Sequence, residues 1–521
     1  MRNLPILDLL IIVTYLVIML LVGIYFSRKN KTSNQFTKAS GKIPGWAIGL
    51  SLYATFLSSN TFLGVPGKAF GTNWNAFVFS ISMPFAAWIA SKYFVPFYRN
   101  IGGVSAYTHL ERRFGPWART YAVVCFLLTQ IARMGTIFFG IALTLQALTG
   151  YSMQSIMLVV GLCIIIYTVL GGIEAVIWTE VIQAGIKTIG AVLILYLIIK
   201  DLPGGVFKIL EIGQKSQKFS LGSLSPNFTE STFWVVLFYG FFMNLNNFGM
   251  DQNYVQRYYA ATSVKKASKS IWLCVWLYLP VSLLFFFIGS SLYAYSQVHP
   301  EFLDVIKHQV AAEHLNGNSS TAEIIKMAST LKVSDYADKV MPNFMVTQIP
   351  SGLLGLIVSA ILSAAMSTIS SGMNSSATVF SVDIYNRYIK PEISDKQNLS
   401  VLHIGTVIFG LSGMGTGIAL IGVKSLLDIW WLLSGVFAGG VLGLFLLGIV
   451  SKTSKNAEAL TATIIGVFVI LWMTFSYYLP EKFSFLISPV HESMIIVIGT
   501  MTIFLTGLLL TSVRKNHLKA D

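Results

Sequence analysis

Charged residues are scarce in this sequence. They make up 11% of the 521 residues, whereas hydrophobic residues make up 54%, and in a soluble domain about a quarter of the residues are charged. Apolar runs of about 20 residues recur along the whole chain, and each is long enough to cross the hydrocarbon layer of a membrane as a helix. The composition excludes a soluble globular protein and predicts an all-α protein that spans the lipid bilayer.

Cysteine and the common catalytic and ATP-binding motifs are also lacking. The three cysteines lie within apolar runs without metal-ligand spacing, so we expect neither disulfides nor a zinc site. There is no Walker A sequence, no HExxH pattern and no Ser/His/Asp pattern, which argues against a nucleotide-driven pump and against an enzyme. The net charge of +14 comes from short clusters between the apolar runs, so we expect no nucleic acid partner.

Hydropathy and turn residues together predict about thirteen spanning helices. They begin near Ile6, Gly45, Trp74, Ala118, Met153, Val176, Phe233, Ile271, Val346, Val401, Leu426, Ala457 and Val490. An odd count places the two termini on opposite sides of the membrane. Basic clusters predict which loops are cytoplasmic, and these loops contain Arg28, Arg99, Arg257, Arg387 and Lys452. The expected topology in the plasma membrane has the N-terminus outside and the C-terminus in the cytoplasm.

Two of the predicted spans, 45–70 and 233–254, are rich in polar residues and glycine in their second halves, and we interpret both as broken helices. If each opens a unit of five spans, the two units have opposite orientations and form an inverted repeat around a site at the bilayer midplane. The predicted parts are an extra N-terminal helix with its loop (1–44), the first repeat (45–200), an extracellular loop (201–231), the second repeat (232–450), and two C-terminal helices with a tail (451–521).

Arg133 lies in the middle of the fourth span without a carboxylate within one helical turn. A charge at that depth is costly, so it is expected to face a cavity. Because a guanidinium matches a carboxylate with two parallel hydrogen bonds, we interpret Arg133 as the binding group for an acidic solute. The alternative is a structural ion pair with a distant protein carboxylate such as Glu180.

Ser367, Ser370 and Ser371 fall on one face of the ninth span. Their hydroxyls, with free carbonyls from a broken helix, are the oxygen donors that a sodium ion needs, although small hydroxyl residues also serve ordinary helix packing. Glu180, near the start of the sixth span, is either an intramembrane carboxylate for a coupling ion or an interfacial residue solvated by the cytoplasm.

With these residues in place, the chain resembles the sodium:solute symporter family over nearly its full length. The resemblance lies in four segments: Ala54–Phe62, Gly171–Gln183, Asp251–Tyr258 and the Ser/Thr run through Ser371. It implies the inverted-repeat fold first seen in the leucine transporter (LeuT), with one additional N-terminal helix and two C-terminal helices, and alternating access driven by sodium. Within the family, the chain is most similar to bacterial sialic acid symporters.

This resemblance implies specific site residues. Substrate contacts would come from Phe56, Ser58, Thr61, Ser80, Arg133 and Asn244. The principal sodium site would use Ala54, Leu57, Ala364, Ser367 and Thr368. A possible second sodium site would use Glu180, Ser367, Ser370 and Ser371. The resemblance to sialic acid symporters with a second sodium site implies aspartate at the position of Glu180, and the likeness predicts threonine and glutamine at Phe56 and Ser80. The second ion and the exact sugar acid are therefore open.

The expected function is sodium-coupled import of sialic acid (N-acetylneuraminic acid) or a related sugar acid by a monomer. The alternatives are a sodium symporter for another carboxylate solute, a membrane receptor that senses solute without moving it, and a channel. Two broken helices with convergent polar groups favour an occluded site over an open pore.

Overall fold

The computed structural model describes residues 5–28, 31–315, 320–423, 426–476, 479 and 481–520. In those ranges the regular structure is helical, apart from one isolated bridge between Ile43 and Ala261. The helices of the main body are α1 (Ile6–Ser27), α3 (Gly45–Phe56), α4 (Ser59–Gly71), α5 (Val78–Ile89), α6 (Val95–Ile101), α8 (Pro116–Thr149), α9 (Met153–Asp201), α11 (Phe233–Gly249), α12 (Gln252–Ala260), α13 (Val264–Val298), α17 (Leu353–Val379), α18 (Asp395–Ala419), α19 (Leu426–Val450), α20 (Asn456–Phe475) and α21 (Ile495–Ala520). The remaining α-helices are α2 (Ser33–Lys38), α7 (Thr108–Phe114), α10 (Gly205–Lys215), α14 (Pro300–His314), α15 (Thr321–Thr330) and α16 (Val333–Gln348).

Within these ranges, ten helices are long and apolar enough to cross a membrane, or eleven if α3 and α4 form one bent span. The longest, α9, contains a kink at Gly172, whose φ of 58° is a backbone conformation that glycine adopts without steric cost. The kink separates the two spans predicted to start near Met153 and Val176. The helical, multi-span architecture is confirmed, whereas the count of thirteen and the boundaries of the repeats stay predictions.

Both predicted helix breaks are present. Helices α3 and α4 are bent by 52° across Leu57 and Ser58. Helix α11 ends at Gly249, and α12 begins at Gln252, so Met250 and Asp251 separate the two helices. At the first break the backbone is extended at both residues, because the ψ angles of Leu57 and Ser58 are 93° and 177°. Carbonyl groups at such a break have no partner further along the helix and can bind other groups.

Helix α17 is the most enclosed spanning helix, with 89% of its most apolar window buried. It packs against α8, α9 and α18. Its predicted start near Val346 is wrong, because Val346 belongs to α16 and α17 begins at Leu353, after the Pro350 interruption. At this start the carboxylate of Asp8 accepts hydrogen bonds from the backbone N–H groups of Gly352 (2.7 Å) and Gly355 (2.6 Å). The extra helix α1 thus caps α17 at the end where the helix dipole favours negative charge.

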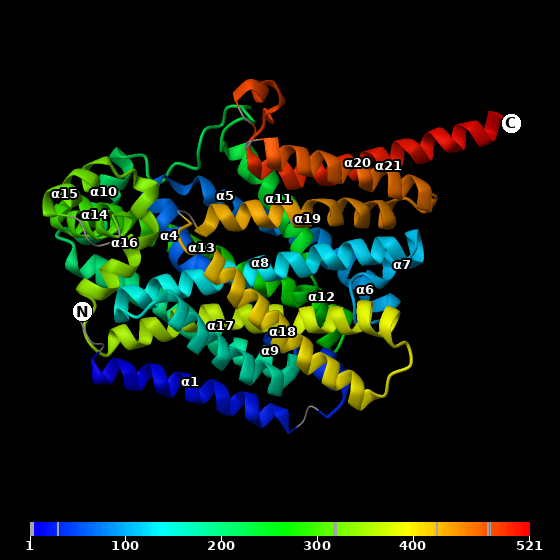
Figure 1. Ribbon diagram of the computed structural model, residues 1–521, viewed down its shortest axis with the longest axis horizontal. Helices are drawn as coiled ribbons and strands as arrows, with labels where there is room; N and C mark the ends of the chain where they lie inside the picture. The colour runs from blue at the N-terminus through cyan, green and yellow to red at the C-terminus, as the bar shows by residue number, and fades with distance from the viewer. Residues whose placement is uncertain are drawn as a thin grey trace.

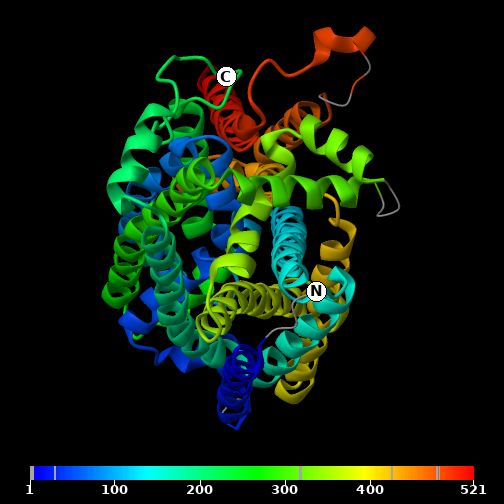
Figure 2. The same ribbon diagram turned by 90° about the vertical axis from the view of Figure 1, so that its left-hand side faces the viewer.

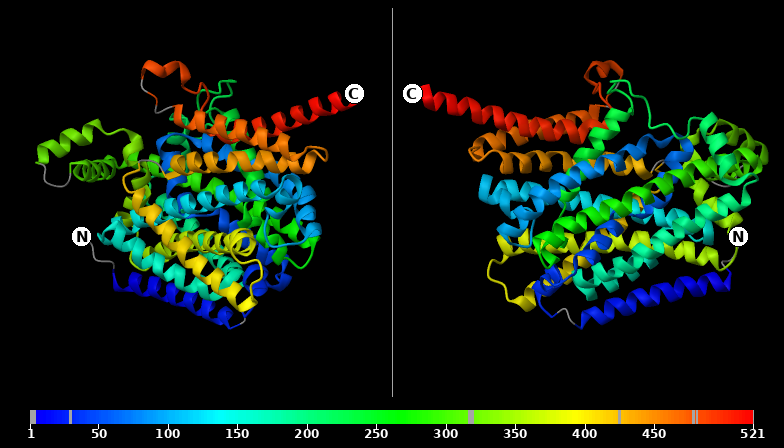
Figure 3. Two further views of the ribbon diagram at one scale, coloured as in Figure 1. Left: turned by 45° about the vertical axis from the view of Figure 1, so that its right-hand side comes forward. Right: turned by 180° about the vertical axis from the view of Figure 1, so that it is seen from behind.

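The long helices run roughly along the horizontal axis of Figure 1, and the two termini lie at opposite ends of that axis. The short helices α10, α14, α15 and α16 gather at the end where the N-terminus lies, and Figure 2 shows that end toward the viewer. Helix α1 forms one flank and the pair α20 and α21 forms the opposite flank in the views of Figure 3. Most residues of α3 and α4 and all residues of α12 are buried, so these parts of the broken helices lie inside the bundle.

Candidate substrate and ion site

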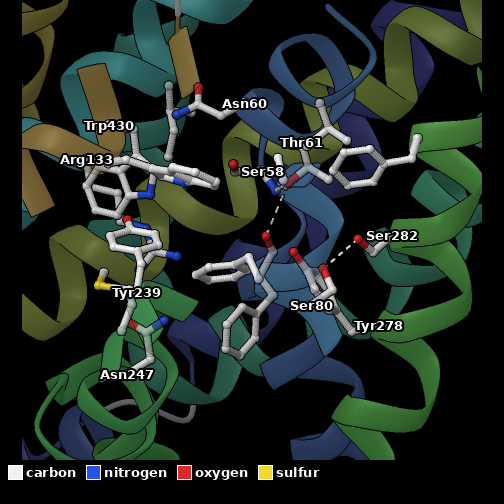
Figure 4. Close-up of a pocket in the computed structure, with 18 residues that line it drawn as sticks. Ser58, Asn60, Thr61, Ser80, Arg133, Tyr239, Asn247, Tyr278, Ser282 and Trp430 are labelled. Carbon is white, nitrogen blue, oxygen red and sulfur yellow. Dashed lines mark hydrogen bonds between the residues drawn. The ribbon is translucent and has the colours of Figure 1, made fainter. Parts of the chain in front are cut away.

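A cavity lies beside the break between α3 and α4, enclosed by helices α4, α5, α8, α11, α13 and α19. Five of the six residues predicted to contact substrate line it: Phe56, Ser58, Thr61, Ser80 and Arg133. In Figure 4, Arg133 lies beside Trp430 on one side of the cavity, and Ser80, Tyr278 and Ser282 lie on the opposite side. The cavity therefore has one cationic wall and one hydroxyl-rich wall.

The cationic wall is the guanidinium of Arg133, which projects from α8. Its Nη2 donates a hydrogen bond to the carbonyl of Thr55 at 3.1 Å, and its Cζ lies 5.6 Å from the centre of the Trp430 ring. The nearest acid is Asp251, with 3.6 Å between Nη1 and Oδ2. A guanidinium has five N–H donors, so this loose pairing leaves donors for a bound anion. The alternative, an ion pair with a distant protein carboxylate, is present in part: the partner is Asp251 and not Glu180, which binds Arg257.

The hydroxyl-rich wall lies across from Arg133. The hydroxyls of Ser80 on α5 and Ser282 on α13 are 2.7 Å apart. The Phe56 ring packs at 4.9 Å from the Tyr254 ring and 5.3 Å from the Tyr278 ring, measured between centroids. Such a surface offers hydrogen-bonding groups and an aromatic floor to a polyhydroxylated solute.

Asn244 does not face the cavity. Its amide Nδ2 donates to the carbonyl of Phe79 and to the hydroxyl of Ser82, both at 3.2 Å, so it joins α11 to α5. Asn247, three residues further along α11, lines the cavity instead. The contact predicted for Asn244 is thus offered by a neighbouring asparagine.

The ligands predicted for the principal sodium site converge at the first break, and a lysine lies among them. The Nζ of Lys187 on α9 donates to the carbonyls of Ala54 (2.7 Å) and Leu57 (2.9 Å) and to the hydroxyl of Ser367 (2.6 Å). The other two predicted ligands adjoin this group, since the carbonyl of Ala364 accepts hydrogen bonds from the hydroxyls of Ser367 at 3.2 Å and Thr368 at 3.3 Å. The oxygen donors suit sodium, but three of them already bind an ammonium group.

The residues predicted for the second sodium site also hold a cationic side chain. Arg257 Nη2 lies 2.8 and 2.7 Å from the two carboxylate oxygens of Glu180 and 2.6 Å from the hydroxyl of Ser371. Both members of this ion pair are fully buried. The Ser370 hydroxyl instead donates to the carbonyl of Ser367 at 3.2 Å. Glu180 is therefore buried and not solvated, and its charge is balanced by Arg257, whereas its role as a ligand of a coupling ion stays a prediction.

Sequence reasoning missed Lys187 and misplaced Arg257. Lys187 lies seven residues after Glu180 in the same apolar run, so the rule that singled out Arg133 applies to it equally. Arg257 was predicted to mark a cytoplasmic loop, but it lies in α12 with no exposed surface. Lys265 and Lys266 follow it closely in sequence, so the three basic residues together were interpreted as a cytoplasmic loop.

Comparison with known proteins gives a consistent classification. Residues 36–466 match the family model described as the sodium:solute symporter family. The chain belongs to that family, so it is a multi-pass membrane transporter of the secondary type and not an enzyme.

Two curated relatives are each 32% identical to this chain. The sodium/sialic acid symporter NanT of Aliivibrio fischeri aligns over 97% of this chain and 93% of its own length. The sodium/sialic acid symporter SiaT of Proteus mirabilis aligns over 94% and 93%.

The structural comparison shows the same fold. A Na+-coupled sialic acid symporter, solved in a substrate-bound, outward-open state, is 30% identical, covers 98% of both chains and has a TM-score of 0.84. Mhp1, a nucleobase-cation-symport-1 family transporter, has a TM-score of 0.52 at 12% identity over 92% of this chain and 94% of its own, a similarity that concerns the fold alone. These matches confirm the predicted fold class.

Proposed function

We propose that this protein is a sodium-driven symporter that imports sialic acid or a related sugar acid. The observation that carries the proposal is the Arg133 guanidinium, which lines the cavity at the broken helix and binds its nearest acid only loosely, at 3.6 Å. The names of the two relatives that are 32% identical and span nearly the whole chain support sialic acid as the solute. A sugar acid has a binding group for each wall of the cavity. Its carboxylate pairs with Arg133, and its hydroxyls form hydrogen bonds with Ser80 and Ser282.

Ion pairs on the two sides of the cavity are suited to serve as gates. On the side of the N-terminus, Lys68 of α4 binds Asp428 of α19 at 2.9 Å. On the side of the C-terminus, Arg119 of α8 binds Asp383 at 2.6 Å and Glu111 of α7 at 2.6 Å. In this proposal the Lys68–Asp428 pair separates when the site opens outward, and Arg119 separates from its two acids when the site opens inward. The solute is then never exposed to both sides at once.

The orientation in the membrane is part of the same proposal. The N-terminus lies outside with α10, α14, α15 and α16, and the C-terminus lies in the cytoplasm. In this proposal one chain is the transporting unit and acts as a monomer; the support is that residues of a single chain line the cavity. Sodium is the coupling ion, as in the symporters to which the chain is similar.

Proteoliposomes loaded with unlabelled N-acetylneuraminate test this proposal. Labelled N-acetylneuraminate added outside should accumulate by counterflow, and an inward sodium gradient should drive uptake that a choline gradient does not. Counterflow distinguishes a carrier from a channel or a receptor, since only a carrier exchanges labelled for unlabelled solute. If pyruvate or another simple carboxylate competes and N-acetylneuraminate does not, the solute is a different acid. If no acid exchanges, the proposed function is refuted.

A further inference from the structure

Lys187 is a charged side chain at a position where the family resemblance implies a free ion. It lies in the half of α9 that follows the Gly172 kink and has no exposed surface. Its Nζ binds Ala54, Leu57 and Ser367 at 2.6–2.9 Å, and each of these residues was predicted to coordinate sodium. One ammonium group thus joins α9, the break after α3, and α17.

The partners of this ammonium are neutral oxygens. No carboxylate is paired with Lys187 in the described part of the chain, whereas Arg257 has Glu180 and Arg133 has Asp251. The five charged side chains near the two breaks are three cations (Lys187, Arg257 and Arg133) and two anions (Glu180 and Asp251). Their sum is one positive charge. A monoanionic sugar acid balances that charge without any added cation. A sodium ion added beside the ammonium would raise the local charge again in a region of low dielectric constant.

Geometry makes the two cations alternatives. Only two points in space lie at fixed distances from three given oxygens, and the ammonium nitrogen takes one of them. A sodium ion that contacted the same three oxygens would meet the nitrogen itself or face it at close range with like charge. We propose that Lys187 is a tethered competitor of sodium: its ammonium supplies the cation at the first break, and sodium binds these oxygens only after the side chain has left them.

This inference rests on the proposed function only for the statement that sodium drives transport. The competition between the Lys187 ammonium and sodium can be measured on the purified protein, without any transport. It also gives Lys187 a structural task. While the ammonium is bound, it holds the extended Leu57 and Ser58 segment, and with it the Ser58 and Thr61 side of the cavity, in the described arrangement.

The test compares the sodium response of the wild type with that of Lys187→Met, which keeps an unbranched side chain one atom shorter and removes the charge. Thermal unfolding of the purified protein is followed in sodium chloride titrated against choline chloride, without solute. The sodium concentration for half-maximal stabilisation should fall at least about tenfold in Lys187→Met, because the site is no longer blocked in most molecules. Sodium should also restore much of the stability that the variant loses in choline.

The matched control is Lys218→Met. Lys218 is another buried lysine whose Nζ binds two carbonyls, those of Phe70 (2.6 Å) and Thr72 (2.9 Å), at the end of α4. Its loss should lower stability equally in sodium and in choline.

Several outcomes would overturn the competition. A sodium midpoint in Lys187→Met within about threefold of the wild-type value would do so, and so would the absence of a sodium response in both proteins. If Lys187→Met does not fold in either salt, Lys187→Gln takes its place.

Acylation of the wild type provides a test that needs no variant. Labelling of the Lys187 amine, read by mass spectrometry, should rise with sodium as the side chain is expelled, and labelling that does not change with sodium would overturn the inference. Failure of N-acetylneuraminate uptake would refute the proposed function and leave these sodium measurements unaffected.

Discussion

Replacement of Arg133 by lysine tests how the cavity holds its anion. Lysine keeps the positive charge that Asp251 faces at 3.6 Å, so the variant does not leave a buried carboxylate without a counter-charge. It removes the planar fork, and with it the second of two parallel hydrogen bonds to a carboxylate. Arg133→Ala would also abolish binding, but it would leave Asp251 unbalanced and mix a folding defect with a binding defect.

The expected magnitude follows from the one bond lost. A hydrogen bond to a charged group contributes about 1.5–3 kcal/mol, and each 1.4 kcal/mol corresponds to a factor of ten in affinity. Arg133→Lys should therefore weaken binding of N-acetylneuraminate about 10- to 150-fold. The hydrogen bond from Nη2 to the Thr55 carbonyl is lost as well, so part of the effect reflects a less rigid α3 terminus.

Calorimetric titration with the acid and with its methyl ester separates these two effects. The ester keeps the sugar hydroxyls and lacks the charge, so its affinity reports the rest of the cavity. The wild type should prefer the acid strongly, and Arg133→Lys should lose most of that preference while its affinity for the ester changes little. If the variant retains the full preference for the acid, the carboxylate binds elsewhere and Arg133 is a structural partner of Asp251.

Three further changes have defined outcomes. Glu180→Gln leaves the buried Arg257 without its carboxylate, so thermal unfolding in detergent should show a loss of about 3–5 kcal/mol, part of which Arg257→Gln restores in the double variant; a melting point equal to wild type would contradict the buried pair. Lys68→Met breaks the link to Asp428, so a cysteine reagent should label an introduced cavity cysteine faster from outside, and an unchanged rate would exclude this pair as a gate. Gly172→Ala places a methyl group on a residue with φ of 58° and should cost about 1–3 kcal/mol of stability by the same unfolding assay, whereas a neutral result would mean that the kink relaxes.

Much of the architecture could be predicted because membrane helices impose simple rules on sequence. Apolar length located the spans, and polar residues within an apolar run located both breaks, since backbone groups in lipid need partners. The same rule of costly charge identified Arg133, which the structure places in the cavity.

The rest depended on information that periodicity does not contain. Whether Asn244 or Asn247 faces the cavity depends on the rotation of α11, which a sequence pattern fixes only to within a turn. That Lys187 reaches the first break depends on how α9 packs against α3, a contact between segments 130 residues or more apart along the chain. Arg257 could not be told from a loop residue because its partner, Glu180, is 77 residues away.

The covalent attachment of the Lys187 ammonium to α9 has an electrical consequence. An ion released on the far side of the membrane contributes about 2.3 kcal/mol per 100 mV to the accumulation of solute, whereas a charge that stays on its helix returns to its starting point in every turnover and contributes nothing. If a single sodium ion accompanies a monoanionic sugar acid past this lysine, the turnover moves no net charge. The voltage across the membrane then has no direct effect on the final concentration ratio of the solute. The ratio of sodium concentrations across the membrane alone sets that limit.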